Sequence, residues 1–143
     1  MTATLVFRSM GDGDVEEIIA LWQRCGLTRP WNDAARDIAF ARANANSDVL
    51  MACLDGDVTA SVMVGHDGHR GAVYYVSVDP ALQGRGFGRQ TMAAAEAWFD
   101  ARGVWKLNLL LRADNQKVRG FYEALGYEVE PRLCMARKLT RTE

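Results

Sequence analysis

Residues 78–89 read VDPALQGRGFGR, and this stretch decides the fold. The run that precedes it, residues 72–78, is rich in β-branched and aromatic residues and predicts a strand. Three glycines then alternate at positions 84, 86 and 88, and the apolar residues that follow have helical spacing up to Gly103. The stretch therefore predicts a strand, a glycine loop and a helix start in direct succession.

Such a helix start is suited to an anion. The N–H groups of a first helical turn have no intrahelical acceptor, and the helix dipole places partial positive charge there. Glycine has no Cβ that would hold a phosphate away from the backbone, and Arg85 and Arg89 add positive charge. The alternative is that the three glycines only permit a tight turn and close packing of the helix on the sheet.

Two common nucleotide loops do not match this spacing. A Walker loop needs Gly-Lys-Ser/Thr, which the chain lacks. A Rossmann loop needs GxGxxG after the first strand, whereas the glycines here are spaced GxGxG late in the chain. The sequence therefore does not predict an ATP or NAD site of either type.

The segments on both sides of the glycine loop predict a mixed α/β sheet. Asp-Gly turns at residues 55–56 and 67–68 predict antiparallel hairpins, and the helix between the strands 72–78 and 105–111 implies a parallel crossover. The expected order is β-α-α-β-β-β-α-β-α-β-β, with helices on both faces of the sheet. The expected strands are 4–8, 49–54, 58–64, 72–78, 105–111, 127–130 and 133–139, and the expected helices are 12–25, 32–46, 84–102 and 116–125.

Length and composition indicate one globular domain that spans residues 1–143. The 17 basic and 18 acidic residues give a net charge of −1, which argues against a nucleic-acid-binding protein. Three separated cysteines and two histidines argue against a disulfide framework and against a metal site. No apolar run is long enough to span a membrane, and residues 1–8 do not read as a signal peptide. We therefore expect a soluble, cytoplasmic protein with reduced thiols.

The glycine stretch resembles the acyl-CoA loop of the GNAT superfamily of N-acyltransferases, Gln/Arg-x-x-Gly-x-Gly/Ala. The match is Gln83-x-x-Gly86-x-Gly88. Residues 75–78 resemble the strand that pairs with the pantetheine arm of CoA. Asn115 and the segment 121–127 (FYEALGY) resemble the Asn…FYexxGF segment of the family. The resemblance is strongest over residues 70–128, and several N-terminal stretches are similar to the small bacterial YpeA-type members.

The resemblance implies acetyl-CoA as co-substrate, with no metal. The backbone N–H groups of residues 83–89 would bind the pyrophosphate, and the backbone of Val76 and Val78 would pair with pantetheine. The N–H of Val78 is the candidate for stabilising the oxyanion, whereas the valine side chains fit ordinary core packing. The implied pyrophosphate-binding residues are Gln83, Gly84, Arg85, Gly86, Phe87, Gly88 and Arg89.

Tyr122 is the candidate catalytic side chain. The resemblance implies that its phenol protonates the departing thiolate as a general acid. From spacing alone, Tyr122 belongs to an apolar helical stripe with Val118 and Leu125, which is typical of a core residue. Asn115 likewise fits both a helix cap and a pantetheine contact.

The general base is unassigned, because residues 71–78 contain no carboxylate. Asp79 is expected to cap or stabilise the loop. The acceptor side is expected to include Trp22, Arg24 and Trp31 from the first two helices and their connection, although the spacing of Trp22 also fits the core.

Together these features predict an N-acetyltransferase that transfers acetyl from acetyl-CoA to a primary amine by direct attack in a ternary complex. The amine belongs to a small molecule, a peptide or a protein. The alternatives are a catalytically inactive CoA-binding sensor, which the missing carboxylate favours, and a structural module without CoA affinity. The resemblance also allows a homodimer.

Overall fold

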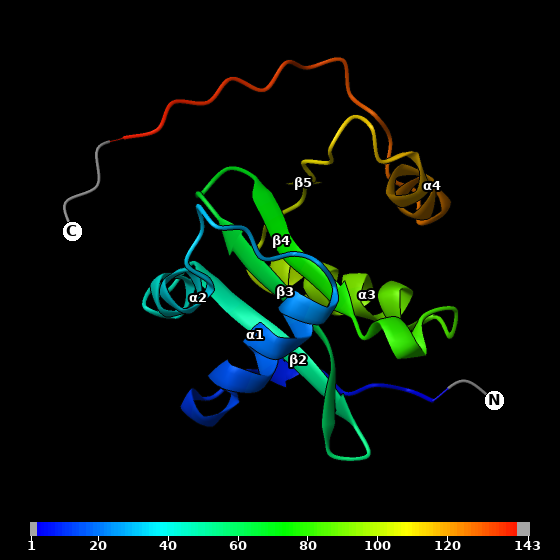
Figure 1. Cartoon of the computed structure of the whole chain (residues 1–143). Helices are drawn as coiled ribbons and strands as arrows, with labels where there is room; N and C mark the ends of the chain where they lie inside the picture. The colour runs from blue at the N-terminus through cyan, green and yellow to red at the C-terminus, as the bar shows by residue number, and fades with distance from the viewer. Residues whose placement is uncertain (1–2, 140–143) are drawn as a thin grey trace. The chain divides into compact units, whose positions relative to one another are not determined.

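The computed structural model describes residues 3–139 of the chain. The chain divides into two compact units, Met1–Leu110 and Leu111–Glu143, which are described separately. The first unit contains β1 (Arg8–Ser9), α1 (Val15–Arg24), α2 (Ala34–Arg42), β2 (Ser47–Leu54), β3 (Asp57–His66), β4 (Gly71–Val78), α3 (Phe87–Asp100) and β5 (Leu107–Asn108) (Figure 1). Short 3-10 helices precede α1 at Asp12–Asp14 and α3 at Pro80–Leu82. The second unit contains α4 (Gln116–Ala124).

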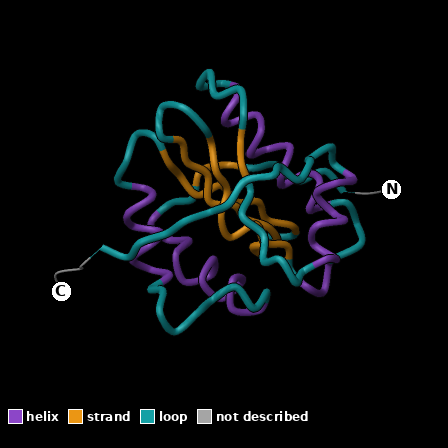
Figure 2. The backbone as a smooth tube through the Cα atoms, turned by 90° about the horizontal axis from the view of Figure 1, so that it is seen from above, coloured by secondary structure: helices purple, strands orange, loops and turns teal. Residues whose placement is uncertain are grey.

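The first unit is built on a five-stranded sheet in the order β1-β2-β3-β4-β5. The first three pairings are antiparallel, and β4 pairs with β5 in parallel. Figure 2 shows these strands in orange, gathered in one group. At the β2–β3 turn, Asp55 and Gly56 have φ of 53° and 87°, the left-handed conformations that an Asp-Gly hairpin turn supplies. The mixed α/β sheet expected from the sequence is therefore confirmed.

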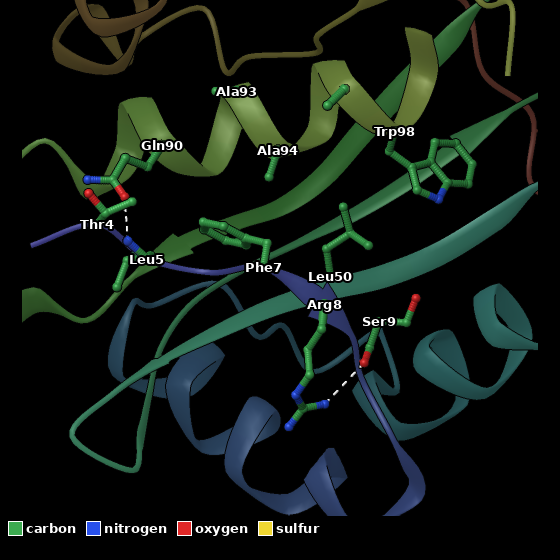
Figure 3. A pocket seen from close by; sticks show the side chains of 11 residues that line it. Thr4, Leu5, Phe7, Arg8, Ser9, Leu50, Gln90, Ala93, Ala94 and Trp98 are labelled. Atoms are coloured by element: carbon green, nitrogen blue, oxygen red, sulfur yellow. Dashed lines mark hydrogen bonds between the residues drawn. The ribbon is translucent and has the colours of Figure 1, made fainter. Parts of the chain in front are cut away.

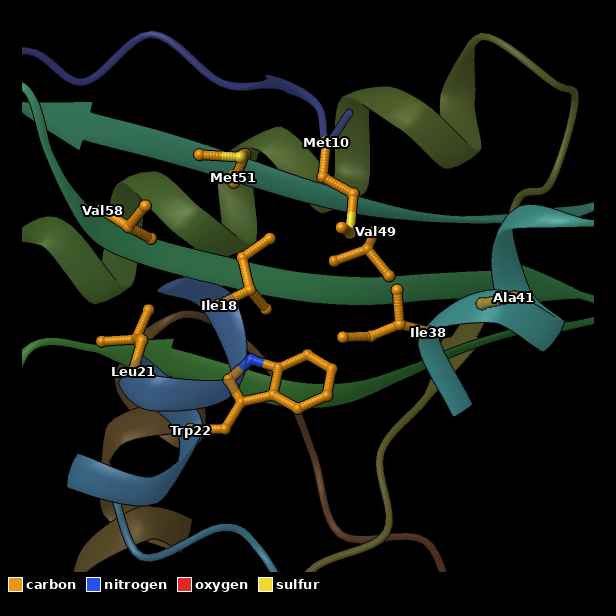
Figure 4. Packing of buried hydrophobic residues seen from close by; sticks show 9 residues of the cluster. All are labelled: Met10, Ile18, Leu21, Trp22, Ile38, Ala41, Val49, Met51 and Val58. Atoms are coloured by element: carbon orange, nitrogen blue, oxygen red, sulfur yellow. The ribbon is translucent and has the colours of Figure 1, made fainter. Parts of the chain in front are cut away.

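Helices cover both faces of this sheet. Because side chains alternate along a strand, Val49 and Met51 of β2 pack with Ile18 and Trp22 of α1, as Figure 4 shows. Leu50 and Ala52, which alternate with these residues along β2, face the opposite side of the sheet. Ala52 packs there with Phe87 of α3. The α1–α2 layer and α3 therefore lie on opposite sides of the sheet.

Several elements are shorter than the sequence predicts, among them α1 and α3, which begin three residues later than expected. Only Arg8–Ser9 of the first strand pairs with β2, because the preceding backbone bonds a side chain instead. The N–H of Leu5 donates to Gln90 Oε1 (2.7 Å), and Gln90 Nε2 donates to the carbonyl of Ala3 (2.9 Å). The second helix begins only after Asp33, whose carboxylate accepts from the N–H of Arg36. The strand expected at 105–111 is limited to Leu107–Asn108.

The two strands expected at 127–130 and 133–139 are wrong, because the described part of the chain contains no strand after β5. Alternating apolar residues favour a strand, and Leu133 and Met135 do alternate. A strand also needs a neighbouring edge for its N–H and C=O groups. Within the described part of the second unit, α4 is the only regular element, so Leu133 and Met135 stay exposed.

A shallow hollow of about 790 Å³ lies between residues 4–9 and α3, as Figure 3 shows. Its lining is mostly apolar and includes Leu50 of β2 and three alanines of α3. Polar groups on its wall are already engaged, since Gln90 bonds the backbone and Arg8 pairs with Asp14 (2.9 Å). None of residues 76–89 lines it, so the glycine loop is not part of its wall.

Close packing of α3 on β4 depends on Gly71. A Cβ added there would lie 2.5 Å from Cε1 of Phe99, much closer than a carbon–carbon contact allows. We expect Gly71→Ala to lower the free energy of unfolding by about 1–3 kcal/mol, the usual range for overpacking a core. Urea denaturation measures this change. The matched control is Gly13→Ala, where a Cβ meets no atom within 4 Å. Equal stability of the two variants would contradict the packing.

Candidate functional site

The start of α3 is an uncapped helix N-terminus. Gly84 and Gly86 have φ of 83° and 81°, which glycine adopts without strain, and Gly86 is the N-cap residue. The first backbone bond of the helix runs from the N–H of Gln90 to the carbonyl of Gly86 (3.2 Å). The N–H groups of residues 87–89 therefore have no acceptor within the helix, and the N-cap residue provides no side-chain bond to them. Arg85 and Arg89 are exposed beside these groups.

Two anchors hold this loop to the sheet. The side chain of Phe87 is fully buried with Leu5, Ala52 and Ala60, so only its backbone is available to a ligand. At the other end, the Asp79 carboxylate accepts from the N–H of Ala81 (3.0 Å), which confirms its expected capping role. Both anchors fix the path of the backbone, which is what an anion site made of N–H groups requires.

Arg24 ties α1 to the same loop. Its guanidinium lies 3.2 Å from Oδ2 of Asp79, which is the first residue of the loop. The side chain of Arg24 is about half exposed, so this ion pair positions the loop without burying charge.

The end of β4 leaves backbone groups without a strand partner. Within the first unit, β5 pairs only with Gly71 and Ala72 of β4. The N–H of Asp79 points to β3, where it donates to the carbonyl of Thr59 (2.8 Å). Because backbone groups alternate along a strand, the N–H and C=O of Val78 point to the opposite edge. The Cys25 thiol donates to this Val78 carbonyl (3.3 Å), consistent with that orientation.

A bulge in β4 lies just before these residues. The β3–β4 register shifts between Ser61 and Met63, so that Tyr75 and Val76 are opposite a single β3 residue. Tyr75 has a φ of 53°, which is strained for an aromatic residue. The side chain of Val76 is half-buried.

The three residues expected at the acceptor side lie in different environments. Trp22 is fully buried in the core, where its Nε1 donates to Ser61 Oγ (2.8 Å), so its ring cannot face a substrate directly. Arg24 pairs with Asp79, whereas Trp31 is 69% exposed in the connection between α1 and α2. The core alternative therefore describes the position of Trp22.

The second unit contains the remaining candidate residues. Asn115 caps α4, since its Oδ1 accepts from the N–H of Val118 (3.2 Å). Tyr122 is buried, with the rings of Phe121 and Tyr127 packed edge-on at 5.0 and 5.7 Å between centroids. Burial raises the pKa of Tyr122 to about 12, so the phenol is fully protonated at neutral pH.

The sequence did not predict a contact in the first unit between β4 and α2. The hydroxyl of Tyr75 donates to Oδ2 of Asp37 (2.8 Å), which joins β4 to α2. The two residues are 38 positions apart, and neither belongs to a motif that would have paired them.

The model of the acetyltransferase (GNAT) family matches residues 15–127 of this chain. The chain belongs to the GNAT family of acetyltransferases. An acetyltransferase of Yersinia enterocolitica is 41% identical over 132 residues, which covers 92% of this chain and 94% of that protein. The YpeA-type resemblance stays a prediction.

Solved GNAT structures share the fold. An aminoglycoside N-acetyltransferase in complex with CoA superposes with a TM-score of 0.81 at 18% identity, covering 94% of each chain. A predicted acetyltransferase of Clostridium acetobutylicum, solved with acetyl-CoA, superposes with a TM-score of 0.77 at 14% identity over 93% of this chain and 96% of that chain. In the described residues of this GNAT protein, no helix has the length and apolar character that crossing a membrane requires.

The Cys25–Val78 contact can be tested chemically. Burial raises the pKa of the Cys25 thiol, which lowers its thiolate fraction at a given pH. Cys53 and Cys134 are exposed. We expect iodoacetamide at pH 8 to alkylate Cys25 more slowly than the other two cysteines, as followed by peptide mass spectrometry. Alkylation of all three at one rate would contradict the contact.

Proposed function

We propose that this GNAT acetyltransferase transfers the acetyl group of acetyl-CoA to a primary amine by direct attack in a ternary complex. The observation that carries the proposal is the uncapped start of α3, which one loop joins to the unpaired end of β4. The N–H groups at the start of α3 suit a phosphate, and the unpaired backbone at the end of β4 suits an amide-containing chain. The two solved neighbours hold CoA and acetyl-CoA, which supports the same ligand class here.

The backbone N–H groups of residues 83–89 would bind the pyrophosphate of CoA, with Arg85 and Arg89 adding positive charge. The backbone of Val76 and Val78 would bond the pantetheine amides as a neighbouring strand does. Asn115 would add a contact to pantetheine besides capping α4. The side chains of Phe87 and Val78 would contribute packing only.

In the reaction, the amine nitrogen attacks the thioester carbonyl carbon and forms a tetrahedral intermediate. The N–H of Val78, directed away from β3, would donate to the oxyanion. The C–S bond then breaks, and Tyr122 would protonate the departing thiolate while the amine loses a proton to solvent. The raised pKa of Cys25 makes its thiol a poor nucleophile at neutral pH, which favours direct attack over an acyl-enzyme.

A single domain over residues 1–143, a cytoplasmic location and a homodimer stay predictions of this proposal.

The pyrophosphate site is tested by Gly86→Asp, which puts a carboxylate beside the N–H groups of α3. We expect the affinity for acetyl-CoA to fall at least tenfold, which corresponds to about 1.4 kcal/mol. Calorimetric titration with acetyl-CoA, CoA, ATP and NAD measures this loss and the selectivity for the two CoA species.

Gly103→Asp is the matched control for this variant. Gly103 has a similar φ of 77°, and a Cβ there meets no atom within 4 Å. It follows the C-terminal end of α3, so its affinity for acetyl-CoA should equal that of the wild type. Unchanged affinity in Gly86→Asp would refute the pyrophosphate site.

Tyr122→Phe tests the general acid. We expect kcat to fall about 10²-fold or more, the usual contribution of a general acid, with the KM for acetyl-CoA little changed. A general acid acts only while protonated, and a pKa of about 12 keeps Tyr122 protonated past pH 10. The kcat of the wild type should therefore not decline between pH 8 and pH 10 through ionisation of Tyr122. Tyr74→Phe, at a half-exposed position of β4, is the control, and an unchanged kcat in Tyr122→Phe would exclude the role.

A further inference from the structure

A connected set of aromatic and polar side chains joins the sheet to α1 and α2. Tyr75 lies flat on Trp22, with ring centroids 3.8 Å apart and an interplanar angle of 3°. At one end Trp22 donates to Ser61, and at the other the Tyr75 hydroxyl donates to Asp37. Asp37 of α2 is therefore held in one position by a residue of β4, and we call these two residues the Asp37–Tyr75 pair.

The bulge explains why Tyr75 can reach α2. The extra residue in β4 turns Tyr75 out of the regular ladder, at the strained φ of 53°. Strained backbone persists only where its surroundings hold it, and here the stack on Trp22 and the bond to Asp37 do so. Both members of the pair are of intermediate burial, so Asp37 is partly exposed to solvent.

The pair lies on the side of β4 opposite to α3. Cys25, which follows α1 directly, contacts the Val78 carbonyl on this same side. If the glycine loop binds CoA from the α3 side, an acceptor reaches a thioester at Val78 past α1 and α2. Tyr75 and Val78 are three residues apart, which is about 10 Å along a strand. Asp37 is therefore placed to contact a remote part of the acceptor rather than the reacting nitrogen.

The bond to Tyr75 leaves the negative charge of Asp37 in place. Burial, together with Asp37 itself, raises the pKa of Tyr75 to about 12, so the phenol is neutral. Two of the arginines on the same helices have other carboxylate partners, since Arg24 pairs with Asp79 and Arg42 with Asp12. The carboxylate of Asp37 is fixed, partly exposed and bonded to Tyr75, which lies about 10 Å along β4 from the proposed reaction centre at Val78. An anion in this position is suited to bind a cationic group.

We propose that Asp37 selects acceptors that carry a second positive charge, so that the substrate class is small polyamines. This inference rests on the proposed acetyltransferase function and adds the substrate class to it. Asp37 would ion-pair with one ammonium group while the other amine, deprotonated, attacks the thioester. Tyr75 acts as a positioning residue because it orients the carboxylate without contacting the acceptor.

The test compares spermidine with butylamine, a primary amine without a second charge. For the wild type we expect kcat/KM to be at least tenfold higher with spermidine. Asp37→Asn should raise the KM for spermidine at least tenfold and leave the KM for acetyl-CoA and the rate with butylamine within about twofold. Calorimetric titration of spermidine into the CoA-loaded protein should show the same loss of affinity without any turnover.

Three variants separate charge from structure. The side-chain amide that Asp37→Asn introduces can still accept from Tyr75, so this variant should keep the wild-type Tm. Tyr75→Phe keeps the charge and the stack but loses the donor, and should raise the KM for spermidine less than Asp37→Asn does. Glu17→Gln removes an equal charge from an exposed position of α1 and should change nothing. A lower Tm in Asp37→Asn with an unchanged KM for spermidine would show a purely structural pair and overturn the proposal.

The remaining outcomes also discriminate. Equal binding of spermidine by wild type and Asp37→Asn, or no spermidine preference in the wild type, overturns the polyamine inference. If acetyl-CoA still binds and butylamine is still acetylated, the proposed function stands despite that failure. If acetyl-CoA does not bind the folded wild type, the proposed function itself fails.

Discussion

The candidate site depends on one constraint, which is that β4 stops pairing with β5 after Ala72 while it stays paired with β3. A strand without a neighbour presents N–H and C=O groups that need partners. At Val78 the carbonyl has a weak donor, the Cys25 thiol at 3.3 Å, which a better partner can replace. The start of α3 presents further N–H groups nine residues later, so two sets of backbone groups available to a ligand follow each other along the chain.

The two faces of the sheet contribute different parts of the proposed site. On the α3 side, a glycine loop anchored by Phe87 presents backbone N–H groups to an anion. On the α1–α2 side, the proposed acceptor site is bordered by side chains with fixed hydrogen bonds, namely Trp22, Tyr75 and Asp37. In the proposed reaction, backbone groups would bind the co-substrate and side chains would contact the acceptor. The residues of the glycine loop were visible in the sequence, whereas the link between Tyr75 and Asp37 was not.

Local signals were reliable wherever one residue type suits one backbone conformation. The positive φ of Asp55-Gly56 followed from residue type, and so did the capping by Asp79 and Asn115. Signals failed where a distant side chain replaced a local pairing. Gln90 bonds the backbone expected to form the first strand, and the link from Tyr75 to Asp37 depends on a bulge that no turn residue announces. The alternation of Leu133 and Met135 is typical of one face of a strand, but it does not show whether another strand lies beside it to pair with its backbone.

The polar side chains of β4 also bear on how the acceptor loses its proton. Ser77 lies buried, with its hydroxyl 2.8 Å from that of Ser61, and it is committed to that pair. Tyr75 has a pKa raised to about 12 and already donates to Asp37, so it cannot accept a proton at neutral pH. Asp37 of α2 accepts a hydrogen bond from Tyr75, which lies at the bulge, three residues before Val78. Neither Ser77 nor Tyr75 is therefore suited to act as the base, whereas the partly exposed end of the strand gives water direct access. A polyamine fits this arrangement, because charge repulsion between its own ammonium groups lowers the pKa of the attacking amine and makes deprotonation by solvent easier.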